Sequence, residues 1–181
     1  MPYFNIVAET SENTVVTEYE PVKKRSDSYQ SEAALEQEFI RLLCEQGYEY
    51  LPIHTEKDLI ANLRKKLEEL NNYQFSDTEW DDFFKNAVAN PNEHIVEKTR
   101  KMQEDNVQVL TRDDGSSKNI TLIDKKNIHN NRLQVINQYV IGTENGAKHD
   151  NRYDVTVLVN GLPLVHIELK RRGVALSLIH I

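Results

Sequence analysis

The chain has 181 residues, of which 39% are hydrophobic and 28% charged, and its formal net charge is −7. This balance is ordinary for one soluble globular domain with a sizeable core. No apolar run approaches the roughly 20 residues that span a bilayer, and the N-terminus lacks a secretion-signal pattern, so we expect a cytoplasmic protein. The single cysteine, Cys44, excludes an internal disulfide and a cysteine metal cluster, and its helical context predicts a small buried residue.

The charge is unevenly distributed along the chain. Residues 1–110 carry 12 Lys and Arg against 22 Asp and Glu, whereas residues 111–181 carry 10 against 7. The net acidity argues against a free-standing DNA-binding protein, which would normally be basic. We expect DNA to contact residues 111–181 only, and we expect other proteins of an assembly to supply strong DNA affinity.

The elements in chain order predict α/β organisation. Short strands are expected over 3–9 and 14–20, followed by a charged connector. Helices are predicted from Ser31 to about Gln46, after the capping sequence Thr55–Asp58, after Ser76, and over 93–104. Strand patterns then occupy 107–110, 120–123, 133–141 and the hairpin 153–172. Helices followed by strands of this kind indicate a mixed central sheet flanked by helices.

Several features have a structural and a functional interpretation. Aromatic residues over 73–84 have acidic neighbours, so they predict a core or a partner contact rather than stacking on nucleic acid. The acids over 77–82 are expected to be solvated. The sequence Asp113-Asp114-Gly115 predicts a plain turn, and His129 is expected to hold its loop rather than a phosphate. No Walker motif occurs, which excludes this class of ATP site from the chain.

The hairpin is the most informative segment. Two alternating apolar runs flank Asn160-Gly161, a strong turn signal, with Asp154 on the first run and Glu168 and Lys170 on the second. A two-residue loop would pair odd with even positions and set the apolar faces against each other. A longer loop or a bulge pairs odd with odd and places Asp154 beside His166 and Glu168, so we predict one of these.

Two carboxylates and an ammonium suit a divalent cation and an activated water, the minimum for phosphodiester hydrolysis. The alternative is a solvated Glu-x-Lys ion pair on an exposed strand. Because the predicted register puts Asp154 on the same face as Glu168 and Lys170, the residues alone favour the cation site and the solvated ion pair about equally.

Five stretches in order along the chain carry a resemblance to a known family. The chain resembles the PD-(D/E)xK nucleases, and more closely the N-terminal domain of the restriction (motor) subunit of type I restriction-modification enzymes. The stretches are Ser31–Glu36, Gly47–Tyr50, Asn127–Arg132, Asp150–Asp154 and Gly161–Gly173.

The resemblance implies a PD-(D/E)xK restriction-endonuclease-like core and Mg²⁺-dependent cleavage of DNA. By this analogy Asp154 and Glu168 are metal ligands, and Lys170 positions the attacking water and offsets charge on the phosphate. Glu36 matches the family's helix glutamate that reaches the metal, although its early position in a helix also favours an acid. Tyr153 replaces the proline often found before the aspartate.

The resemblance also implies partners. They are double-stranded DNA and the modification (methyltransferase) and specificity subunits, while ATP would serve only motor domains that are absent here. Arg171, Arg172 and His166 are the expected DNA contacts. The implied layout is 1–30 as N-terminal strands and connector, 31–175 as the nuclease domain, and 176–181 as an aberrant or truncated tail. The family's following helix with Gln and Tyr is missing, so we expect a weak or inert nuclease.

Two other functions stay open. The first is a catalytically inert module that docks the subunit onto its partners, which the acidic helical half favours. The second is a repair or recombination nuclease of the same superfamily, which should not match the 31–50 and 127–132 stretches.

Overall fold

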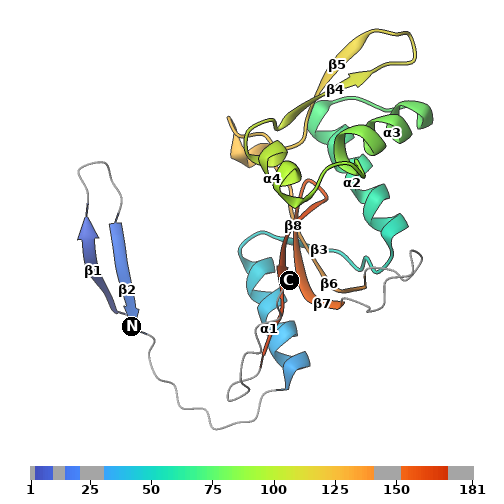
Figure 1. Cartoon of the computed structure of the whole chain (residues 1–181). Coiled ribbons are helices and arrows are strands. Elements are labelled where there is room, and N and C mark those ends of the chain that lie inside the picture. Colours follow the sequence, from blue (N-terminus) through green and yellow to red (C-terminus); the bar gives the residue numbers. More distant parts are fainter. Residues whose placement is uncertain (1–2, 10–14, 21–30, 141–151, 171–181) are drawn as a thin grey trace. The chain divides into compact units, whose positions relative to one another are not determined.

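The computed structural model describes residues 3–9, 15–20, 31–140 and 152–170 (Figure 1). The chain divides into two compact units, residues 1–30 and 31–181. In the first, β1 (Tyr3–Glu9) and β2 (Val15–Glu20) lie where the sequence predicts strands, and they pair antiparallel. Within the described ranges, no helix is long and apolar enough to cross a membrane.

Three helices of the second unit begin at the predicted capping residues. The side chains of Ser31, Thr55 and Ser76 each accept a hydrogen bond from a backbone N–H in the first turn that follows. Such caps satisfy amides that have no partner inside the helix. The helical elements are α1 (Glu32–Glu45), α2 (Glu56–Asn71), α3 (Asp77–Phe83), the π-helical turn η1 (Phe84–Val88) and α4 (Ile95–Gln103).

A four-stranded mixed sheet forms the centre of this unit. Its order is β3-β6-β7-β8, with β3 parallel to β6 and the other neighbours antiparallel. Helix α1 contacts β3 and β7 (Figure 1). The expected α/β class, a mixed sheet flanked by helices, is confirmed. The strands are β3 (Glu49–Tyr50), β6 (Leu133–Val140), β7 (Arg152–Val159) and β8 (Leu162–Ile167).

A separate hairpin joins β4 (Val107–Thr111) to β5 (Ser117–Thr121). The second strand lies earlier than the predicted 120–123. The predicted turn around Gly115 is tight, and Ser117 therefore already pairs with Thr111. A short 3-10 helix, η2 (Ile128–Asn130), precedes β6.

The larger hydrophobic core is built on the aromatic segment. Phe75, Trp80 and Phe83 are buried against Leu63 and Leu67 of α2. Phe75 meets Trp80 edge-on with ring centroids 5.4 Å apart, a favourable aromatic geometry. The predicted core role of these rings is therefore confirmed. A second cluster, next to the central sheet, consists of Ile53, Ile136, Tyr139 and Leu158.

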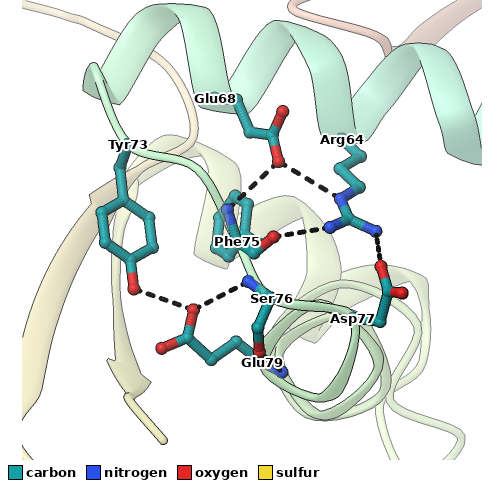
Figure 2. A network of polar contacts seen from close by, with 7 residues as sticks. All are labelled: Arg64, Glu68, Tyr73, Phe75, Ser76, Asp77 and Glu79. Atoms are coloured by element: carbon teal, nitrogen blue, oxygen red, sulfur yellow. Dashed lines mark hydrogen bonds and ion pairs between the residues drawn. The ribbon is translucent and has the colours of Figure 1, made fainter.

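Glu79 shows that the acidic cluster is not uniformly solvated, which corrects the prediction. Its carboxylate is buried and accepts hydrogen bonds from Tyr73 Oη (2.8 Å) and Ser76 N (3.1 Å), as Figure 2 shows. It also accepts a hydrogen bond from Asp113 N (3.1 Å). Burial alone would raise the pKa of Glu79, but these hydrogen bonds and the charge of Arg112 outweigh it and lower the pKa. The carboxylate thus joins the start of α3 to the turn after β4.

Arg64 links α2 to the same segment. Its guanidinium donates to Glu68 Oε1 (3.2 Å), Phe75 O (2.6 Å) and Asp77 Oδ1 (2.8 Å) (Figure 2).

A second correction concerns Cys44, which is exposed rather than buried. The periodicity of α1 identified its apolar stripe, but it did not show how much of the helix other elements cover.

Candidate functional site

The turn of the β7–β8 hairpin combines a two-residue loop with a bulge. Asn160 and Gly161 have φ values of +51° and +83°, which suit a two-residue hairpin turn, and Val159 pairs with Leu162. The register then shifts at Leu164, so that Thr156 pairs with His166. From there odd positions pair with odd and even with even, and the predicted bulge is confirmed.

The apolar face of β8 is less covered than the sequence suggested. Val165 is 48% exposed although it lies on the odd face, because β8 is at the edge of the described sheet. The contacts of Asp154, Glu168 and Lys170, rather than the burial of the apolar face, therefore define the candidate site.

The turn itself is anchored on the neighbouring elements. The buried Asn160 side chain donates to Leu122 O (3.0 Å) and Asn131 Oδ1 (2.8 Å) and accepts from Arg132 N (2.8 Å). Gly161 packs directly on the backbone of Leu63 in α2. These contacts fix the position of the hairpin relative to the rest of the unit.

The loop before β6 is held by Asp124 rather than by a histidine side chain. Asp124 Oδ1 accepts from the backbone N–H groups of Lys126 (3.0 Å) and Asn127 (2.9 Å), and Oδ2 accepts from Asn130 Nδ2 (2.7 Å). These hydrogen bonds lower the pKa of Asp124. His129 contributes its backbone N–H to Asn127 Oδ1 (3.3 Å), and its side chain is exposed.

Asp154 lies against the main chain that follows β8. Its Oδ2 accepts a hydrogen bond from Leu169 N at 2.7 Å, and the residue is half-buried. Strand β8 ends at Ile167, so Glu168 and Lys170 follow the strand instead of belonging to it, which corrects the prediction. The structure thus brings Asp154 to the 168–170 segment.

Glu168 and Lys170 form an ion pair, with Nζ 2.5 Å from Oε1. The hydrogen bond to Glu168 and the negative charges of Glu168, Glu32 and Asp154 raise the pKa of Lys170 above its ordinary 10.5. Lys170 therefore stays protonated at neutral pH. It can balance charge and donate hydrogen bonds, but it cannot act as a base.

Glu36 reaches the sheet from the first part of α1. It is buried and accepts hydrogen bonds from Asn137 Nδ2 (2.6 Å) and from Gln138 Nε2, one on each carboxylate oxygen. Asn137 Oδ1 in turn accepts from Tyr50 Oη at 2.9 Å. Glu32 is exposed in the first turn of α1, where an acid favours the helix dipole.

The two amides that hold Glu36 were missed by the sequence analysis. The signal that could have found them is a polar pair, Asn137-Gln138, inside the otherwise mostly apolar strand β6. A polar pair in such a strand needs a polar partner.

His166 lies on β8 near the same end of the hairpin. Its Nδ1 is 3.0 Å from Thr156 Oγ1, and its ring stacks on Tyr153 with centroids 4.1 Å apart. Partial burial lowers the pKa of His166, so the ring is largely neutral at pH 7. Arg171 and Arg172 lie outside the described residues, as does the tail 176–181.

The candidate site has two acidic side chains that suit a hard cation such as Mg²⁺. Within the described part of the chain, no three His, Cys, Asp or Glu side chains converge as a metal-binding set. Asp154 and Glu168 nevertheless offer two carboxylates at one end of the hairpin. Mg²⁺ is commonly held by one or two carboxylates, with water and substrate phosphate completing its shell, so this pair fits it.

Comparison with known proteins identifies the family. The profile described as "Type I restriction enzyme R protein N terminus" matches residues 29–178. The type I restriction enzyme EcoprrI endonuclease subunit of Escherichia coli is 47% identical over 171 residues, which make up 94% of this chain and 53% of that protein.

Two staphylococcal relatives are more distant. The SsaAORF53P endonuclease subunit of Staphylococcus saprophyticus is 36% identical over 82% of this chain and 16% of its own length. The SauMSSORF170P subunit of Staphylococcus aureus is 37% identical over 83% and 16%. The chain therefore spans about half or less of the length of these relatives. It belongs to the family of type I restriction enzyme R protein N-terminal regions.

Proposed function

We propose that this chain is the nuclease part of a type I restriction R subunit, with a PD-(D/E)xK core that hydrolyses DNA phosphodiester bonds with Mg²⁺. The observation that carries the proposal is the hairpin register, which brings Asp154 to the main chain between Glu168 and Lys170. The names of the relatives, which are endonuclease subunits of type I restriction enzymes, agree with it.

Each residue of the hairpin has a distinct role in this proposal. Asp154 and Glu168 hold the cation, which when bound activates a water molecule and polarises the scissile phosphate. Lys170, kept protonated by Glu168, orients the attacking water and balances charge on the phosphate. Glu36, on α1, contacts the cation through water, and the side-chain amides of Asn137 and Gln138 hold its carboxylate in place.

DNA contact and target choice involve other groups. His166 and the arginines 171 and 172 hold the DNA backbone, and His166 does so as a neutral donor. The modification and specificity subunits select the target, and ATP is consumed by motor domains outside this chain. The net charge of −7 fits a module that relies on partners for DNA affinity.

Isothermal titration with Mg²⁺ and Mn²⁺ tests the cation site. We expect binding heat in the wild type, its loss in Asp154→Ala and Glu168→Ala, and its retention in Glu38→Ala. Glu38 is the matched control because it is also an exposed acid paired with a cation, Arg41. Efficient plasmid cleavage by this chain that survives Asp154→Ala would refute the mechanism and the site.

The second candidate is a catalytically inert docking module. Ile95 and Val96 favour it, because they are 77% and 63% exposed on α4 and suit contact with another protein surface. In that case the wild type gives no cation heat. Ile95→Asp with Val96→Asp would then abolish sedimentation of the chain with the modification and specificity subunits.

A further inference from the structure

Gln138 has an unusual backbone for a strand residue. Three non-glycine residues of the described chain have positive φ: Asn72, Gln138 and Asn160. Asn72 ends helix α2 and Asn160 forms the hairpin turn, so both occupy places where this conformation is common. Gln138, at φ +54°, lies inside β6. This conformation is unfavourable for a residue with an ordinary side chain, so the surroundings must impose it.

The register places Gln138 across from the candidate site. Its neighbours Asn137 and Tyr139 pair with Val155 and Tyr153 on β7. Gln138 therefore faces the position of Asp154 on the adjacent strand. The unusual backbone and the proposed cation ligand lie at the same level of the sheet.

The side-chain amide of Gln138 is oriented by Glu36. A carboxylate oxygen accepts hydrogen bonds, so the amide nitrogen Nε2 must face Glu36 and the amide oxygen Oε1 must point elsewhere. This Oε1 is fully enclosed and has no hydrogen-bond partner among the residues that the structure describes. Buried acceptors are rarely left unpaired, because an acceptor removed from water loses its hydrogen bonds to the solvent.

We propose that Gln138 is a further residue of the cation site, whose Oε1 accepts a hydrogen bond from a water molecule bound to the cation. The inference rests on the proposed function. It accounts for the unpaired oxygen and for the left-handed backbone that aims it. It also gives Glu36 a defined task, because Glu36 fixes the amide that faces the cation-bound water. Gln138 is thus a positioning residue for the cation shell.

The test is Mn²⁺ titration of the whole 181-residue chain, with Gln138→Gly as the variant. Glycine tolerates the positive φ and removes the amide, so the fold should be kept. Because loss of a group that supports a metal shell weakens binding about 10- to 100-fold, we expect that increase in Kd. Asn72→Gly, also at a positive φ but at the end of α2, should leave Kd unchanged.

Gln138→Asn serves as a second variant, because asparagine keeps an amide and tolerates positive φ. Its Kd should lie between those of the wild type and Gln138→Gly. If the wild type binds Mn²⁺, Asp154→Ala abolishes binding and Gln138→Gly matches the wild type, the inference is wrong while the cation site stands. If the wild type gives no heat, the cation site itself is wrong and the inference fails with it.

Discussion

Replacing Gly161 with alanine should separate the β7–β8 hairpin from helix α2. A Cβ atom at this position would lie 2.6 Å from Leu63 Cα and 3.0 Å from Leu63 N. Both are backbone atoms in the middle of α2, so no side-chain rotation can relieve the contact. The φ of +83° adds a conformational penalty for any residue with a Cβ.

The expected loss of stability has two parts. A left-handed alanine costs about 1–2 kcal/mol. Forcing an extra carbon into a packed contact costs about 1–3 kcal/mol. The free energy of unfolding should therefore fall by about 2–5 kcal/mol. Gly115→Ala is the matched control, because Gly115 has φ +78° and nothing lies within 4 Å of its Cβ position.

Urea denaturation followed by circular dichroism measures both variants. Gly115→Ala should lose only the conformational part, about 1–2 kcal/mol, and Gly161→Ala should lose about 1–3 kcal/mol more. Equal losses in the two variants would show that the hairpin does not press on α2 as described.

Three further predictions concern other positions. Glu79→Gln should reduce the unfolding free energy by about 1–3 kcal/mol at pH 7. Because the pKa of Glu79 in the folded protein lies below its ordinary 4.5, the difference in stability between wild type and variant should shrink as the pH falls below 4.5. A difference that does not change with pH would contradict this prediction. Asn160→Ala removes three hydrogen bonds of a buried side chain and should cost about 2–4 kcal/mol in the same urea assay, whereas a loss under about 1 kcal/mol would contradict the anchoring role. Cys44 should react with iodoacetamide in the folded protein nearly as fast as in urea, and protection would contradict its exposure.

The sequence predicted features that depend on local rules. The capping residues before α1, α2 and α3 were found because each satisfies amides only a few residues away. The bulge in the hairpin was predicted because side-chain parity allows only a few ways to align two short runs around Asn160-Gly161. Both inferences need no knowledge of distant segments.

Features that depend on distant partners could not be predicted. Glu36 meets Asn137, which is 101 residues away in the sequence, and no local pattern encodes that contact. Glu79 was expected in solvent because its neighbours are acidic, but the turn after β4 supplies a backbone donor from Asp113. The left-handed Gln138 is likewise imposed by its surroundings, since glutamine itself does not favour that conformation.

The extra residue at Leu164 has a consequence for how such a hairpin can evolve. Deleting that one codon would keep the Asn160-Gly161 turn and every charged residue in the sequence, yet it would turn the side chains of all later residues to the opposite face. Leu169 would then occupy the direction now taken by Glu168. The chemistry of this segment is thus encoded by a residue count as much as by residue identity, and a single in-frame loss could silence it while the sequence still matched its relatives.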